Sequence, residues 1–270
     1  MKRFAVLIAC FMIMNMGYAS AESESEIFRK HGVELGTEIS HIAYEEPDFM
    51  KDSGFMYGII GSYAYHNIIM IKADGRLSYG KMDYSSTGTG EADNIDDYLA
   101  ETRGVVGYDF LVYKILSITP YMGIGYRYLK DDSSGITTTT GARGYERESN
   151  YIYSPIGLEI SVPFANDWQT GTMLEYDYFW WGKQKSHLSD AISGLGDIEN
   201  KQTRGWGLRG AVKIEKRTKK IDFIIESFAR YWSIERSKKA NITFAGVAVG
   251  YGIEPKNNSI EYGVKLAWRF

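Results

Sequence analysis

The sequence predicts an all-β protein, a closed, antiparallel, up-and-down transmembrane β-barrel of about ten strands. Polarity alternates with a period of two over segments of roughly 11–16 residues, as in strands whose two faces meet different surroundings. Beyond residue 21 no apolar run approaches the ~20 residues of a membrane-spanning helix. The 21 tyrosines and 6 tryptophans suit aromatic girdles at two membrane interfaces. Because backbone polar groups must pair inside lipid, such strands have to close into a barrel.

The first 21 residues have the features of a cleaved signal peptide. A basic start at residues 1–3 precedes an apolar stretch over residues 4–16, and Ala19-Ser20-Ala21 forms a small-residue cleavage motif. A lipoprotein signal ending at Cys10 is the alternative, although the apolar run before Cys10 is short. We expect cleavage after Ala21, a short leader over residues 22–31 and one barrel domain over residues 32–270. Loss of Cys10 would leave the mature chain without cysteine, so closed sheet pairing would replace disulfides as its source of stability.

Alternation of apolar with polar or small residues marks each predicted strand in turn. Representative apolar residues are, in chain order, Val33 and Leu35; Phe55 and Tyr57; Ile69 and Ile71; Val106 and Tyr108; Met122 and Ile124; Ile156 and Leu158; Leu174 and Tyr176; Leu208 and Val212; Phe223 and Ile225; Val264 and Leu266. The ten predicted strands span residues 32–44, 54–65, 68–83, 97–110, 117–129, 150–164, 168–183, 203–216, 221–236 and 260–270. Connections alternate between long and short, which predicts short periplasmic turns and long extracellular loops.

The last predicted strand, residues 260–270, has the most regular alternation in the chain. Even positions are apolar or aromatic and odd positions are charged or small, and the chain stops on Phe270. This segment resembles the terminal strand of bacterial outer-membrane β-barrels. The resemblance implies a protein of the Gram-negative outer membrane, in contact with lipid and lipopolysaccharide. It also implies that Tyr262, Leu266, Trp268 and Phe270 form the signal read by the barrel-assembly machinery.

Charged residues of both signs share the face opposite the apolar one, which predicts that they fill the lumen. The acidic members are Glu34, Glu38, Asp74, Glu101, Asp109, Glu159, Glu175, Asp177, Glu215, Glu226 and Glu261. The basic members are Lys72, Arg76, Arg103, Arg127, Arg209, Lys213, Arg230, Lys265 and Arg269. A ten-stranded barrel is narrow, so these side chains can close it as a paired network that leaves at most a thin water path. A selective pore and a buried catalytic group are the alternatives.

Two families of outer-membrane enzymes resemble parts of the sequence. Omptin proteases, also ten-stranded barrels, use an Asp pair and an Asp-x-His pair at the outer rim. Here Asp96-Asp97 is adjacent, but His187 and Asp190 have His-x-x-Asp spacing, and the surrounding residues do not match. His187-Leu188-Ser189 is similar to the His-x-Ser of lipid A deacylases, which are smaller barrels with a fuller motif. A protease or lipid A-modifying hydrolase is therefore an alternative without a complete motif.

The remaining signals assign no cofactor and no metal. The four histidines are scattered over separate segments, and no glycine-rich loop can cradle a phosphate. A formal net charge of −3 without a basic aromatic patch excludes nucleic acid as a partner. Polar loops over residues 131–149 and 184–202 could contact lipopolysaccharide, a surface ligand or a host molecule. The apolar stretch 244–251 could extend a hairpin above the membrane or fold over the mouth as a lid. We therefore expect a structural or surface-interaction protein without catalysis, with a narrow porin-like channel or a rim hydrolase as alternatives.

Overall fold

The computed structural model describes residues 31–113 and 115–270. The predicted signal peptide and all of the predicted leader except His31 lie outside these residues. Within the described residues no helix has the length and apolar character needed to cross a membrane.

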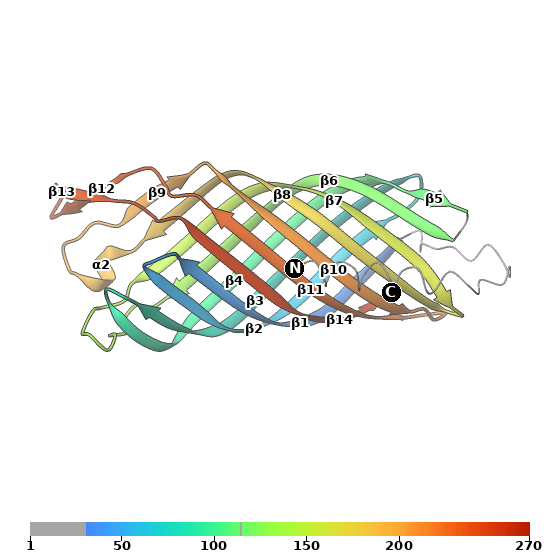
Figure 1. Cartoon of the computed structure of the whole chain (residues 1–270), viewed down its shortest axis with the longest axis horizontal. Coiled ribbons are helices and arrows are strands. Elements are labelled where there is room, and N and C mark those ends of the chain that lie inside the picture. The colour runs from blue at the N-terminus through green and yellow to red at the C-terminus, as the bar shows by residue number, and fades with distance from the viewer. Residues whose placement is uncertain (1–30, 114) are drawn as a thin grey trace.

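The structure is a closed antiparallel barrel of ten strands, which confirms the predicted fold class. Neighbours in the sequence are neighbours in the barrel, and β14 pairs with β1 to close it (Figure 1). β5 continues β4 along β6, and β9 continues β10 along β8, so twelve sheet segments make ten strands. The segments are β1 (His31–Glu46), β2 (Met50–Tyr65), β3 (Ile69–Ser86), β4 (Gly90–Tyr108), β5 (Phe110–Val112), β6 (Leu116–Asp132), β7 (Glu146–Ala165), β8 (Trp168–Ser186), β9 (Ile198–Gln202), β10 (Gly205–Lys216), β11 (Asp222–Ile234) and β14 (Asn257–Arg269).

The strand register places alternate residues on the two sides of the wall. Leu174 and Ile124 are exposed on the outside, whereas their neighbours in the same strands, Glu175 and Gly125, face the interior. An outer face rich in Ile, Leu, Val and aromatic residues suits lipid, because apolar side chains gain nothing from contact with water. The lumen receives polar and charged side chains instead.

The strands are longer at the outer end than predicted. The predicted loops 45–53 and 85–96 are mostly strand, and their turns shrink to residues 47–49 and 87–89. Polar residues pair across these extensions, for example Glu45 with Lys51 and Ser85 with Glu91. Outside the membrane the outer face of a strand meets water instead of lipid and polar residues occupy both faces, so the alternation that predicts strands disappears although the backbone pairing continues.

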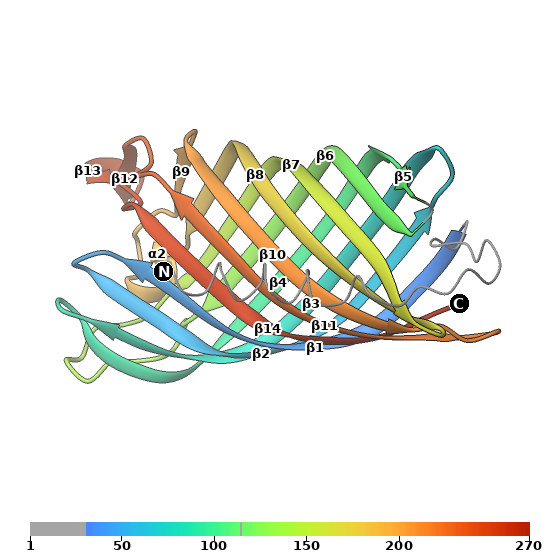
Figure 2. The same ribbon diagram turned by 45° about the vertical axis from the view of Figure 1, so that its right-hand side comes forward.

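The other long loops also contain regular structure. The predicted loop 184–202 includes the one-turn helix α2 (Leu188–Ala191) and β9. The connection between the last two predicted strands contains a separate hairpin of β12 (Ala240–Phe244) and β13 (Val247–Gly252). This hairpin and α2 lie at the end of the barrel opposite the C-terminus (Figure 2). The short turns 66–68, 166–167 and 217–221 lie at the C-terminal end.

Candidate functional site

The middle of the lumen is crossed by ion pairs centred on Arg76 of β3. Its Nη1 lies 2.7 Å from Oε1 of Glu261 and 3.0 Å from Oε1 of Glu38, and its Nε lies 2.9 Å from Oε2 of Glu101. Arg230 of β11 joins the same group, 3.1 Å from both Glu38 and Glu261. All three carboxylates are buried. Residues from five strands therefore meet in one connected layer.

A second centre lies beside the first, around Arg209 of β10. Its Nε is 2.6 Å from Asp177 and 3.2 Å from Glu175, and its Nη1 donates to Glu101 at 3.0 Å. The Tyr153 hydroxyl donates to Glu101 at 2.6 Å. Glu101 accepts from both guanidinium groups, Arg76 and Arg209, so it joins the two centres.

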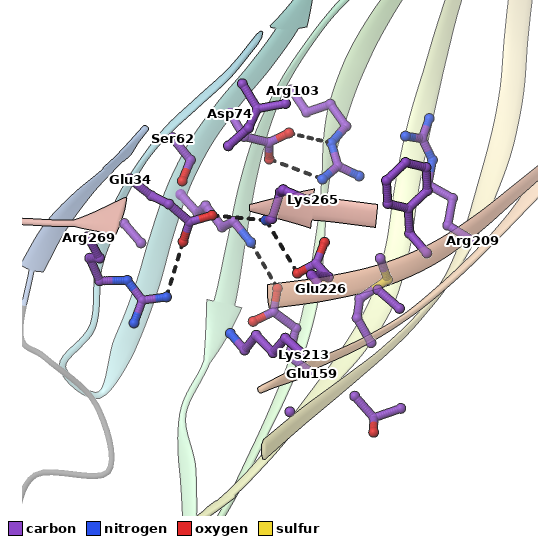
Figure 3. Close-up of a pocket in the computed structure, with 18 of the residues that line it drawn as sticks. Glu34, Ser62, Asp74, Arg103, Glu159, Arg209, Lys213, Glu226, Lys265 and Arg269 are labelled. Atoms are coloured by element: carbon purple, nitrogen blue, oxygen red, sulfur yellow. Dashed lines mark hydrogen bonds and ion pairs between the residues drawn. The ribbon is translucent and has the colours of Figure 1, made fainter. Parts of the chain in front are cut away.

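Further pairs continue the network toward the C-terminal end of the barrel (Figure 3). Lys265 lies 2.9 Å from Glu34 and 3.3 Å from Glu226, and Arg269 lies 3.1 Å from Glu34. The same region contains the pairs of Lys72 with Glu159 at 3.0 Å, Arg103 with Asp74 at 2.8 Å and Arg269 with Glu215 at 2.9 Å.

The predicted lumen residues all lie on the inner face, but two of them form no ion pair with a described residue. The Arg127 guanidinium lies 5.4 Å from the ring centroid of Trp232, and its Nε is buried without a hydrogen-bond partner. Lys213 lines the interior beside Gly171. On β14, the predicted assembly residues Tyr262, Leu266 and Trp268 face outward, and Phe270 follows the strand with an exposed ring.

An aromatic group that the charge pattern did not reveal covers the outer side of the network. Tyr151, Tyr153, Phe179 and Trp232 pack together with Ile234. The ring centroids of Tyr153 and Trp232 are 5.0 Å apart in an edge-to-face arrangement. The parity of β7, β8 and β11 contains the signal that places these rings inside, because they share the faces of Glu159, Asp177 and Arg230 in those strands.

Two internal cavities lie at different depths in the lumen. One of about 150 Å³ is lined by the network residues of the C-terminal half, including Arg76, Glu101 and Arg209. One of about 60 Å³ at the outer end is lined by residues such as Arg127, Tyr151 and Trp232. The two cavities share no lining residue. The ion-pair layer and the aromatic group therefore separate them.

Three aspartates from neighbouring parts of the wall meet at the outer cavity: Asp52 of β2, Asp97 of β4 and Asp131 of β6. Each aspartate directly follows a charged residue that points outward, namely Lys51, Asp96 or Lys130. The cluster therefore lies beyond the lipid-facing band. Burial and the Asp131 carboxylate raise the pKa of Asp52 to about 8. Burial, Asp131 and Asp52 likewise raise the pKa of Asp97 well above its usual range.

The groups considered for hydrolysis do not assemble into one site. Asp96 points outward, where its carboxylate accepts from Tyr79 at 2.6 Å and Lys81 at 2.8 Å, whereas Asp97 points inward. His187 lies 3.0 Å from Asp197 through Nδ1. Asp190 instead accepts the backbone N–H of Glu146 at 3.1 Å.

The Ser189 hydroxyl does not make the hydrogen bond to His187 that the nucleophile of a His-x-Ser enzyme would need. It donates to Asp197 at 2.8 Å, while the other oxygen of the same carboxylate lies nearest to Nδ1 of His187. A serine nucleophile requires a hydrogen bond to its general base, and among the described contacts Ser189 makes none to His187.

Comparison with solved structures finds other barrels of the outer membrane. The beta domain of the Bordetella autotransporter BrkA has 12% identity and a TM-score of 0.40, with 90% of this chain and 99% of that chain covered. The toluene transporter TodX of Pseudomonas putida has 9% identity and a TM-score of 0.39, with 90% and 89% covered. OprG of Pseudomonas aeruginosa has 10% identity and a TM-score of 0.37, with 90% and 97% covered. These values assign no ligand to this chain.

Comparison with curated protein sequences found no match. The sequence model of the family described as "Autotransporter beta-domain" matches residues 50–214, from the start of β2 into β10, which is more than half of the chain. With its closed ten-stranded wall and lipid-facing apolar side chains, this chain is an outer-membrane β-barrel that belongs to the autotransporter beta-domain family.

Proposed function

We propose that this protein makes contacts at the bacterial surface without catalysis, and that the β12–β13 hairpin is its contact element. The chain would be exported by its signal peptide, and the barrel-assembly machinery of a Gram-negative cell would insert it by reading β14. The barrel then serves as a closed anchor, and the groups outside the membrane carry the interaction. The observation that supports the proposal most directly is the apolar surface of the hairpin.

The hairpin exposes a concentrated set of large apolar side chains. Val247 is 67% exposed, Tyr251 61%, Val249 60% and Phe244 48%. Exposed apolar patches of this kind on soluble surfaces commonly mark interaction sites. Charged residues separate the hairpin from the lipid-facing band, since the exposed pair of Lys256 and Glu235 lies at its base. These side chains therefore lie beyond the lipid-facing band of the barrel wall.

Basic residues accompany the apolar ones. The Nζ of Lys239 lies 3.8 Å from the ring centroid of Tyr251, and Lys238 precedes it in the chain. A surface with ammonium groups beside apolar side chains suits an anionic amphiphile, in which acyl chains adjoin phosphate groups. Lipopolysaccharide has this chemistry, and we propose it as the ligand.

Binding of purified lipopolysaccharide to the barrel tests this proposal. The protein, refolded without lipopolysaccharide, is placed in phosphatidylcholine nanodiscs and titrated with lipopolysaccharide. We expect the double variant Val247→Asp, Val249→Asp to weaken binding by about tenfold or more, because charges replace the apolar contact surface. The control Asn241→Asp changes a polar residue of β12 and should retain binding. Equal binding by the wild-type protein and the double variant, or no binding by either, would overturn the proposal.

A narrow channel receives less support from the geometry. The two lumen cavities have no lining residue in common, and buried salt bridges lie between them. An ion would have to displace these pairs to cross. A rim hydrolase also receives less support, because its candidate residues do not meet. His187 contacts Asp197, Asp190 accepts from the backbone N–H of Glu146, and Asp97 lines the outer cavity.

A further inference from the structure

The aspartate cluster at the outer cavity presents oxygen atoms that the protein leaves without partners. One carboxylate oxygen from each of Asp52, Asp97 and Asp131 lies within 4.8 Å of one from each of the others. The Oδ1 atoms of all three are buried without a hydrogen-bond partner. Asp52 is only 5% exposed. Buried polar atoms normally have a partner, so three adjacent exceptions indicate a missing one.

A fourth side chain shows the same feature independently of the aspartates. Asn257, the first residue of β14, is 4% exposed and lines the same 60 Å³ cavity. Its Nδ2 is buried without a hydrogen-bond partner. The two ends of an amide are assigned from their hydrogen bonds, so either the nitrogen or the oxygen of this group can face the cavity. With the oxygen inward, Asn257 adds a neutral ligand of the same type as the carboxylates.

The surrounding cations do not neutralise the three carboxylates when these are ionised. Arg147 of β7 is a cation that acts on all three carboxylates, but its Nη2 is already held by Glu46 at 2.7 Å and Glu254 at 2.5 Å. Arg127 lines the inner side of the cavity, against Trp232. The other charged groups that act on the cluster are Asp83 of β3, Asp96 of β4 and Asp132 of β6.

We propose that Asp52, Asp97 and Asp131 form a calcium site at the outer end of the lumen, with Asn257 as a further ligand. Calcium takes oxygen ligands at about 2.3–2.6 Å, so two oxygens on one ion can be at most about 5 Å apart. The spacing of the three carboxylates meets this limit. No histidine or cysteine belongs to the cluster, which disfavours zinc. Magnesium would bind more weakly, because it requires closer and more regular octahedral ligands.

The ion would connect parts of the wall that the sheet does not join directly. β2 and β4 are separated by β3, and β14 lies on the other side of β1. Calcium held between them would fix the outer end of the barrel, where the strands extend beyond the lipid. The site would thus stabilise the part of the molecule that bears the extracellular loops.

Calorimetric titration tests the site with calcium and magnesium as probes. The full barrel is refolded in detergent from denatured protein, treated with chelator and titrated. We expect calcium to bind more tightly than magnesium and to raise the temperature of unfolding. Asp52→Asn, Asp97→Asn and Asp131→Asn should each weaken calcium binding by about tenfold or more, since affinity depends on the number of charged ligands. The control Asp96→Asn, next to Asp97 but outward-facing, should weaken calcium binding far less than the cluster variants do, because its carboxylate is held by Tyr79 and Lys81 and is not a ligand.

Two results would overturn the calcium site: no calcium binding by the folded wild-type protein at about 1 mM, the upper range for extracellular sites, or equal losses in Asp96→Asn and the cluster variants. Heat-modifiable mobility on gels establishes that each variant is folded. Terbium luminescence in the wild-type protein gives a second readout that needs no variant. Terbium bound in the cavity should be displaced by calcium, and failure to displace it contradicts the proposal.

Discussion

Three carboxylates surround the Arg76 guanidinium, and each would be costly to bury without it. Removing one member of a buried ion group leaves the others uncompensated, whereas removing one member of an exposed pair changes little. Arg76 contacts Glu38, Glu101 and Glu261, all buried. Its loss therefore affects three charges at once.

We predict that Arg76→Ala lowers the free energy of unfolding by about 3–5 kcal/mol. Urea unfolding of the barrel in lipid vesicles, followed by tryptophan fluorescence, measures this change. The matched control is Lys81→Ala on the same strand as Arg76. It removes the exposed partner of Asp96. That control should cost less than about 1 kcal/mol. Similar losses in both variants would show that the lumen pairs have no special energetic role.

The aspartate cluster gives stability a distinct pH dependence. The folded-state pKa of Asp52 is raised to about 8 by burial and by Asp131, whereas an unfolded aspartate titrates near pH 4. Between these values the folded protein binds more protons than the unfolded one, so stability falls as pH rises. Without divalent cations, we predict that the unfolding temperature decreases from pH 5 to pH 8.

The variant Asp52→Asn should flatten this dependence, because it removes the titrating group and its repulsion with Asp131. The measurement is the temperature at which gel mobility changes, recorded across the pH range in chelator. An unfolding temperature that rises with pH in the wild-type protein would contradict the assigned direction. Arg147 acts on the same carboxylates and opposes their protonation.

Sequence parity predicts which residues face the lumen but not which of them meet. Glu34 and Arg269 are partners because β1 and β14 close the barrel in a register that sets them side by side. Arg127 has the same parity as its charged neighbours, yet it stacks on Trp232 instead of joining an ion pair. Which lumen side chains form ion pairs depends on the strand register and on the width of the lumen. The alternation within one strand predicts neither.

At the scale of the strand, close approach of neighbouring backbones restricts side-chain size. A Cβ added to Gly123 of β6 would overlap the carbonyl oxygen of Gly104 and approach Val105 of the paired strand β4. A Cβ added to Gly104 would meet nothing within 4 Å. The two glycines therefore have different roles although they lie on paired strands.

We predict that Gly123→Ala destabilises the barrel by about 1–3 kcal/mol, because the wall must shift to admit the methyl group. Gly104→Ala should be neutral or slightly stabilising, since the unfolded chain loses conformational freedom without a clash. Urea unfolding of both variants under the same conditions provides the comparison. Equal stability of the two variants would show that the wall adapts without cost.

The strand centres could be predicted from the sequence, whereas the strand ends could not. Within the lipid, Leu174 and Tyr176 must alternate with Glu175 and Asp177, and the pattern is visible. Beyond the lipid this constraint ends, so the extensions at residues 45–53 and 85–96 resemble loops in sequence. A hairpin is one of the two arrangements expected for the apolar stretch 244–251, but the bounds of β12 and β13 could not be predicted, because Val247 and its neighbours are exposed on both faces.

At the scale of the whole molecule, the barrel sorts its side chains by environment: apolar ones toward lipid and charged ones toward each other. This arrangement of side chains explains how the barrel can be anchored in the membrane without a disulfide between described residues. It also distinguishes the barrel from an open pore, because the charges that could line a channel hold one another across it. Glu101, bound by both Arg76 and Arg209, is central to this closure.

Conductance of single barrels in planar lipid bilayers tests this closure most directly. The refolded wild-type protein should produce no current steps above the leak of the bare membrane, because the ion-pair layer and the aromatic group around Trp232 separate the two cavities. Gel mobility of the recovered protein verifies that folded barrels were inserted. Reproducible, stable current steps from the wild-type protein would contradict the account.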